Sequence, residues 1–293
     1  MAEGRIIKAL SGFYYVQSGD NVYPCKGRGV FRNQKISPLV GDFVQYDLDE
    51  NDEGYIMKIN KRTNELVRPP IANITQAIII SSANSPNFST LLLDRFLVLI
   101  EAKNITPVIF ITKIDMLTDS EQSEIEKYQQ VYEGIGYKVE LLSSKDPDNL
   151  PDLSHYFRDN VSVFAGQSGV GKTSLLNALN PSLTLETGEI SRSLGRGKHT
   201  TRHVELIQLY DGLVADTPGF SALDFSEVEA DILSDSFPEI RRYAQLCKFR
   251  GCMHHKEPKC AVKEAVENKK IEVFRYEHYL SFLIEIQSRK QRY

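Results

Sequence analysis

A glycine-rich segment near the middle of the chain has the residues needed to hold phosphate groups. Residues 166–173 read Gly-Gln-Ser-Gly-Val-Gly-Lys-Thr, which fits the pattern GxxxxGK[ST] at every position. The segment follows an apolar run, 161–165, and precedes a stretch with helical character, 174–179. In this frame backbone N–H groups face phosphate oxygens, Lys172 adds a positive charge and Thr173 offers a hydroxyl to Mg²⁺. The sequence therefore predicts a nucleotide-binding loop.

Two motifs earlier in the chain could recognise a base. Residues 112–115, Thr-Lys-Ile-Asp, follow the apolar run 107–111. A carboxylate at Asp115 can accept two hydrogen bonds from the N1 and N2 donors of guanine, whereas adenine lacks that donor pair. Residues 143–145, Ser-Ser-Lys, follow the predicted strand 138–142 and could meet the base from its other side. Each motif alone is weak evidence, because short polar loops after strands are common.

A third motif, Asp216-Thr-Pro-Gly219, ends the predicted strand 212–216. An Asp in this place can hold Mg²⁺, usually through water, and the glycine N–H can contact a γ-phosphate. The tetrapeptide is common by chance, but its position some forty residues after the phosphate loop makes it informative.

The cysteines indicate a metal site. Of the four in the chain, Cys247, Cys252 and Cys260 lie within fourteen residues and enclose two histidines, His254 and His255. Three thiolates and one imidazole form a tetrahedral Zn²⁺ set with no position left for water, which is typical of a structural site. The fourth cysteine, Cys25, is distant in the sequence, and we expect it to be a plain thiol.

The composition is that of an ordinary soluble protein. The chain has 293 residues, of which 41% are hydrophobic and 25% charged, and its net charge is −4. No stretch reaches the roughly 20 apolar residues of a membrane helix, and residues 1–9 lack the apolar core of a secretion signal. We therefore expect a cytoplasmic protein, in which clustered cysteines bind metal more often than they form disulfides.

The elements that would position these motifs fall into three predicted domains. Residues 1–68 contain short aromatic and β-branched runs, which predict a small closed β-barrel of the OB or SH3 type. Residues 69–221 alternate buried strands with helices, as in a doubly wound α/β domain, after a linker at 68–70. One helix is expected at 89–104 and another at 119–134, with Ser120 and Glu124 near the start of the second. Residues 222–293 predict a helical zinc-binding domain, with one or two amphipathic helices after 261.

The order of the motifs resembles that of a circularly permuted GTPase. The base-reading segments precede the phosphate loop, and the switch elements follow it, whereas most GTPases begin with the phosphate loop. With a barrel before and a Cys/His cluster after, the whole chain resembles the RsgA (YjeQ/YloQ) family of small-subunit-dependent GTPases. In that family's pattern the zinc ligand lies two residues after the second cysteine, which here is His254.

The resemblance implies an enzyme that hydrolyses GTP to GDP and phosphate with Mg²⁺, is stimulated by the 30S ribosomal subunit and acts in its late maturation. The implied partners are 16S rRNA and GTP or GDP, with no DNA and no membrane, and a monomer is the default. The residues implied to bind GTP are Thr112, Lys113, Ile114, Asp115, Ser143, Ser144, Gly166, Gln167, Ser168, Gly169, Val170, Gly171, Lys172, Thr173, Ser174 and Gly219. Thr112 stands where most GTPases have an Asn that ties the base pocket to the phosphate loop. Because Thr can keep one such hydrogen bond, we expect guanine selectivity to survive.

The implied hydrolysis lacks one usual group. Most hydrolytic GTPases have a water-orienting Gln after the Asp-x-x-Gly motif, but Phe220 occupies that place. An apolar side chain cannot orient water, so we expect slow intrinsic hydrolysis, with His199 or His203 as the candidate replacement and Lys172 stabilising the transition state. The Mg²⁺ ligands expected are Thr173, Asp216 and either Thr200 or Thr201.

Basic residues gather locally despite the net negative charge. Three patches, one in each predicted domain, could contact RNA phosphates; they contain Lys26, Arg28, Arg32 and Lys35; Arg192, Arg196, Lys198 and Arg202; and Arg241, Arg242, Lys248, Arg250, Lys256 and Lys259. Two other functions remain open from the sequence. One is a phosphate-loop kinase, and the other is a non-catalytic RNA-binding module that uses GTP only as a switch ligand.

Overall fold

The computed structural model describes residues 1–29, 31, 36–49, 53–143, 150–180, 204–216, 225–226 and 228–290. The chain forms two compact units. The first unit comprises Met1–Ala77, Pro147–Ser168 and Lys172–Phe220, and the second comprises Ile78–Asp146, Gly169–Gly171 and Ser221–Tyr293. Both units therefore contain residues of the phosphate loop.

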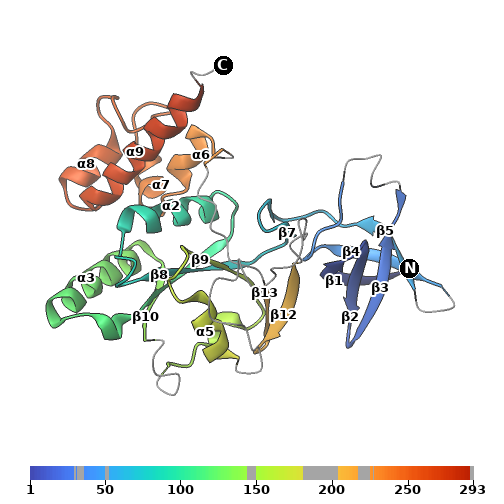
Figure 1. Cartoon of the computed structure of the whole chain (residues 1–293). Coiled ribbons are helices and arrows are strands. Elements are labelled where there is room, and N and C mark those ends of the chain that lie inside the picture. The colour runs from blue at the N-terminus through green and yellow to red at the C-terminus, as the bar shows by residue number, and fades with distance from the viewer. Residues whose placement is uncertain are drawn as a thin grey trace. The chain divides into compact units, whose positions relative to one another are not determined.

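The first unit begins with a closed five-stranded barrel (Figure 1). Its strands are β1 (Ala2–Leu10), β2 (Phe13–Ser18), β3 (Asn21–Gly27), β4 (Phe43–Leu48) and β5 (Gly54–Ile59). They pair in the order β1-β2-β3-β5-β4, and β4 pairs back onto β1, so each of the five has a neighbour on both sides. Alternate side chains such as Ile6, Val16 and Ile56 are fully buried inside. The predicted small barrel is confirmed, because closure is how short strands avoid exposed edges.

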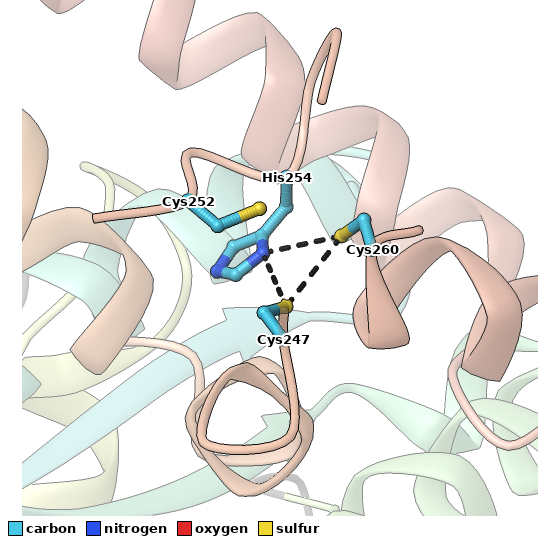
Figure 2. Close-up of side chains that lie close together, drawn as sticks. All are labelled: Cys247, Cys252, His254 and Cys260. Carbon is cyan, nitrogen blue, oxygen red and sulfur yellow. Dashed lines mark hydrogen bonds between the residues drawn. The ribbon is translucent and has the colours of Figure 1, made fainter. Parts of the chain in front are cut away.

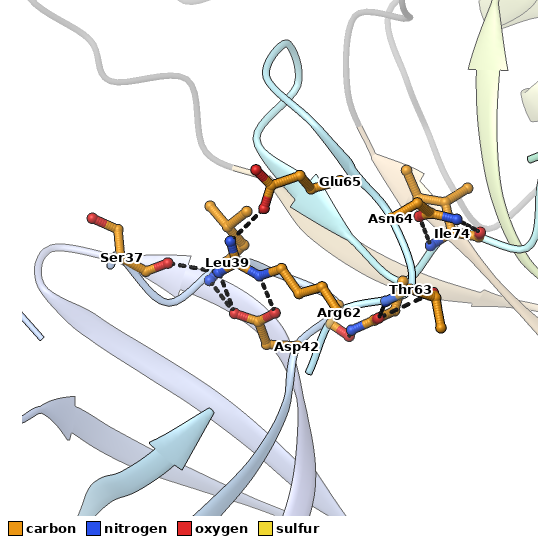
Figure 3. A network of polar contacts seen from close by, with 10 residues as sticks. Ser37, Leu39, Asp42, Arg62, Thr63, Asn64, Glu65 and Ile74 are labelled. Carbon is orange, nitrogen blue, oxygen red and sulfur yellow. Dashed lines mark hydrogen bonds and ion pairs between the residues drawn. The ribbon is translucent and has the colours of Figure 1, made fainter. Parts of the chain in front are cut away.

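A short hairpin follows the barrel. Strands β6 (Glu65–Leu66) and β7 (Ile71–Ala72) pair antiparallel, so Arg68–Pro70 forms part of a turn rather than the open linker expected from the sequence. Figure 3 shows how Arg62 fastens this hairpin to the barrel. Its guanidinium donates to both carboxylate oxygens of the fully buried Asp42, at 2.7 and 2.8 Å, and to the Ser37 carbonyl at 2.7 Å.

The rest of the first unit is a sheet that carries the phosphate loop. Its described elements are α4 (Ser154–Phe157), β11 (Val161–Ala165), α5 (Lys172–Leu179), β12 (Glu205–Leu209) and β13 (Gly212–Asp216). Strand β11 pairs parallel with β13, and β12 pairs antiparallel with β13. All five residues of β11 are buried, as the apolar run predicts. On its other side β12 pairs with β1 of the barrel, where Lys8 and Glu205 form a 2.8 Å ion pair.

The second unit contains the strands that end in the base-reading motifs. In sheet order they are β10 (Lys138–Leu142), β9 (Thr106–Thr112) and β8 (Gln76–Ser82), with helices α2 (Thr90–Glu101) and α3 (Asp119–Ile135) between them in the chain. Strands β9 and β10 are parallel, as predicted. The start of α3 is stabilised by a capping box between Thr118 and Glu121. Ser120 and Glu124 lie near this start, as expected.

The C-terminal residues of the second unit are helical (Figure 1, orange to red). The described helices are α6 (Ala230–Asp235), α7 (Pro238–Ala244), α8 (Ala261–Glu267) and α9 (Val273–Lys290). Arg275 of α9 is fully buried and donates to the carboxylates of Asp94 on α2 and Glu239 on α7. This network fastens α9 to both helices. None of the described helices has the length and apolar character to cross a membrane.

Candidate functional site

The phosphate loop connects β11 to α5 and adopts a backbone that needs glycine. Gly169 has φ +81° and Gly171 has φ +95°, a region that residues with a Cβ rarely occupy. Helix α5 begins at Lys172, two residues earlier than the sequence predicts. The loop therefore delivers Lys172 and Thr173 at the start of a helix, where backbone N–H groups are free to bind an anion.

Lys172 and Thr173 are both suited to a phosphate and its metal ion. The Lys172 ammonium donates to the carbonyl of Gly166 at 2.8 Å and to that of Gln167, and it forms no ion pair with any residue that the structure describes. Burial lowers the pKa of Lys172 to about 8, because no carboxylate among the described side chains compensates for the lost hydration. A phosphate would supply that missing charge. Thr173 is half-buried, and a hydroxyl at this place in a phosphate loop is a typical Mg²⁺ ligand.

In the second unit the first base-reading motif is tied directly to the phosphate loop. The fully buried Thr112 hydroxyl donates to the Val170 carbonyl at 2.6 Å. The Lys113 ammonium donates to the Gly169 carbonyl at 2.7 Å and to the carbonyl of Ser85. The hydrogen bond expected of a Thr in place of Asn is therefore present, and the motif and the loop form one connected element.

The second base-reading motif meets the first through a side-chain hydrogen bond. Ser143, directly after β10, donates from its hydroxyl to Asp115 Oδ1 at 2.7 Å. Asp115 lies in the short 3₁₀ helix η1 (Ile114–Met116), and its carboxylate is exposed. Ser143 thus orients the carboxylate of this exposed residue.

Several predicted site residues lie outside the part of the chain that the structure describes. They are Arg32, Lys35, Ser144, Lys145, His199, Thr200, Thr201, His203, Gly219 and Phe220, together with the basic residues of 191–203. Asp216 is the last residue of β13, but its side chain is not described. The proposed switch and Mg²⁺ roles of these residues stay predictions.

The Cys/His cluster has the geometry of a zinc site (Figure 2). The ligand atoms of Cys247, Cys252, His254 and Cys260 all lie within 4.8 Å of one another. A tetrahedron with Zn–S of about 2.3 Å and Zn–N of about 2.0 Å has S–S edges of about 3.8 Å and S–N edges of about 3.5 Å. The Cys247 and Cys260 sulfurs are 3.8 Å apart, and His254 Nδ1 lies 3.5 and 3.4 Å from them. Three of the ligand atoms thus lie at the edge lengths of a zinc tetrahedron, and the Cys252 sulfur lies within 4.8 Å of them. The cluster can hold Zn²⁺, and His254 rather than His255 completes the set.

The protonation of these ligands depends on burial. Burial raises the pKa of Cys252 to about 12 and also raises the pKa of the Cys260 thiol. Burial lowers the pKa of His254, which keeps the imidazole neutral and able to offer a lone pair. Zinc binding must therefore displace thiol protons. Because the protein supplies all four ligands, the set is typical of a structural rather than a catalytic zinc site.

Two tyrosines hold the ligand-bearing loop in place and were not predicted from the sequence. Tyr276 and Tyr279 of α9 donate from their hydroxyls to the carbonyls of His254 at 2.6 Å and Met253 at 2.8 Å. Their i, i+3 spacing puts them on one face of the helix, but this pattern is equally typical of core tyrosines. Only the fold reveals that this face meets the zinc loop.

The chain matches two family models and is similar to curated relatives along its whole length. The RsgA N-terminal domain model matches residues 3–56, and the RsgA GTPase model matches residues 59–226. The small ribosomal subunit biogenesis GTPase RsgA 2 of Oceanobacillus iheyensis is 69% identical over 293 residues, covering 100% of both chains. The small ribosomal subunit biogenesis GTPase RsgA of Bacillus subtilis is 58% identical over 298 residues, again covering 100% of both.

Solved structures agree with this assignment. The crystal structure of YloQ, described as a circularly permuted GTPase, has a TM-score of 0.86 and 53% identity, covering 100% of this chain and 97% of that one. The structure of YjeQ from Thermotoga maritima has a TM-score of 0.85 and 34% identity, covering 98% of both chains. The base-reading and phosphate-binding segments described above lie within the matched GTPase region. This chain belongs to the RsgA GTPase family.

Proposed function

We propose that the protein hydrolyses GTP to GDP and phosphate and acts in the late maturation of the 30S ribosomal subunit in the cytoplasm. The observation that supports this proposal best is the connection between the base-reading motif and the phosphate loop. It consists of the hydrogen bonds from Thr112 to the Val170 carbonyl and from Lys113 to the Gly169 carbonyl. These bonds hold residues 169–170 of the phosphate loop against the motif that carries Asp115, the proposed acceptor of the guanine donors. The full-length similarity to small-subunit biogenesis GTPases supports the same function.

The proposed roles follow from the chemistry of each side chain. Asp115, oriented by Ser143, accepts the N1 and N2 donors of guanine, and the stem of Lys113 lies along the base. Backbone N–H groups of the loop and the Lys172 ammonium bind the phosphates and stabilise negative charge as it develops. Mg²⁺, held by Thr173, Asp216 and Thr200 or Thr201, would neutralise phosphate charge. His199 or His203 would position water in place of the missing Gln.

We further propose that the chain acts as a monomer of three domains, 1–68, 69–221 and 222–293, and contacts 16S rRNA through its basic patches. In the barrel Lys26 lies over the ring of Phe13, 4.9 Å from its centroid, and Arg5 lies 4.3 Å from that of Phe43. Cationic and aromatic groups on one small barrel are the combination that binds single-stranded or irregular RNA. Contact through backbone and shape is expected rather than base-specific reading.

The test is phosphate release from GTP at fixed Mg²⁺, measured alone, with purified 30S subunits and with 50S subunits. We expect slow release alone and a large stimulation by 30S only. A Thr173→Ala variant provides a control that should lose stimulated turnover. Tight GTP binding without stimulation would instead favour a binding module, and transfer of phosphate to an acceptor other than water would favour a kinase.

A further inference from the structure

A serine outside the ligand set contacts the histidine of the zinc site. Ser234 lies in α6, and its hydroxyl oxygen is 3.0 Å from His254 Nε2. Both residues are buried, His254 with 1% of its surface exposed and Ser234 with 9%. The contact joins residues twenty positions apart, so no local sequence pattern predicts it.

The orientation of the imidazole gives this contact a chemical meaning. Nδ1 of His254 points at the sulfurs of Cys247 and Cys260, so Nδ1 is the atom available to a metal ion. A neutral imidazole that ligates through Nδ1 carries its proton on Nε2. That buried N–H needs an acceptor, and the partner of the second ring nitrogen fixes both the tautomer and the ring orientation of metal-binding histidines. The Ser234 hydroxyl oxygen is placed to accept it.

We propose that Ser234 is a positioning residue of the zinc site, which accepts a hydrogen bond from His254 Nε2 and thereby holds Nδ1 in ligating orientation. The inference rests on zinc binding by the four ligands and does not depend on GTP hydrolysis. It also gives the metal a wider structural effect. Because Ser234 belongs to α6, the first described helix after the Asp216–Gly219 motif, zinc occupancy fixes the position of that helix on the ligand loop.

The test compares zinc affinity in the full-length chain. Ser234→Ala should bind Zn²⁺ about 10–100-fold more weakly in competition with a chelator of known affinity. Ser236→Ala is the matched control, since Ser236 is buried beside the same helix but donates to the Ile232 carbonyl at 2.9 Å. We expect it to stay within threefold of the wild type, and Ser234→Thr, which keeps the hydroxyl, to restore most of the affinity. A Ser234→Ala affinity equal to that of the wild type would overturn the proposal.

A second measurement does not require a folded variant. Long-range ¹H–¹⁵N NMR of the zinc-loaded wild type distinguishes the two imidazole nitrogens of His254. The proposal requires a protonated Nε2 and a metal-bound Nδ1. Ligation through Nε2, or a wild-type chain that binds no zinc, refutes it.

Discussion

The hydrogen bond from Thr112 to the phosphate loop gives a sharp prediction for nucleotide affinity. Thr112→Val keeps the shape of the side chain but removes the hydroxyl donor. The carbonyl of the buried Val170 then loses this hydrogen bond. An intramolecular hydrogen bond contributes about 1 kcal/mol, and a buried acceptor left unpaired costs about 1–3 kcal/mol. In the wild type this bond holds the loop in place before nucleotide arrives. In the variant, binding itself must order the loop.

We therefore expect Thr112→Val to bind GDP about five- to thirtyfold more weakly, which corresponds to roughly 1–2 kcal/mol. Calorimetric titration of GDP measures the loss directly. Thr112→Ser is the control, because it retains the hydroxyl at the same position, and its affinity should remain near that of the wild type. If the Val variant bound GDP as tightly as the Ser variant, the hydrogen bond would have no role in preparing the loop.

Three further predictions concern the same two sites. The pKa of Lys172 is about 8 in the free protein, and a bound phosphate favours the charged ammonium. GDP affinity should therefore fall about fourfold between pH 7 and 8.5, beyond any change seen in a Lys172→Arg variant. Equal pH profiles for the two proteins would contradict this. Asp115→Asn should weaken GDP binding by about a hundredfold without improving ADP binding, because one of two charge-assisted acceptors is replaced by a donor. If a GDP titration showed unchanged affinity, Asp115 would have no role in base recognition. At pH 7, binding of Zn²⁺ should release at least the protons of Cys252 and Cys260, whose pKa values are raised by burial. Calorimetry in buffers of different ionisation enthalpy counts the released protons. A count below two would contradict ligation by both thiolates.

Buried strands and glycine-dependent loops were readable from the sequence. The strands at 138–142, 161–165 and 212–216 have the predicted bounds. The fully buried run 161–165, between polar loops, has few alternative structures. The phosphate loop was equally clear, since its glycines are required by backbone geometry. The zinc ligands were found because they lie close together in the sequence.

Features that depend on tertiary contacts were not readable. Strand β1 mixes charged and apolar residues without clean alternation, and it is a strand because it pairs with three partners. The turn at Arg68–Pro70 looked like a linker, because proline is common in turns and in linkers alike. The contact of Ser234 with His254, and the burial of Arg275 between Asp94 and Glu239, join residues far apart in the chain. Their spacing carries no periodic signal.

The pairing of β1 with three other strands has a consequence for how the protein can be shortened. Strand β1 closes the barrel against β2 and β4 and also covers the edge of β12. Deleting the first ten residues would open the barrel and leave an uncovered strand edge on the sheet that carries the phosphate loop. Exposed edges of this kind template intermolecular pairing and aggregation. A chain truncated at its N-terminus should therefore lose solubility, so a loss of ribosome binding in such a variant would not by itself identify the barrel as the binding surface.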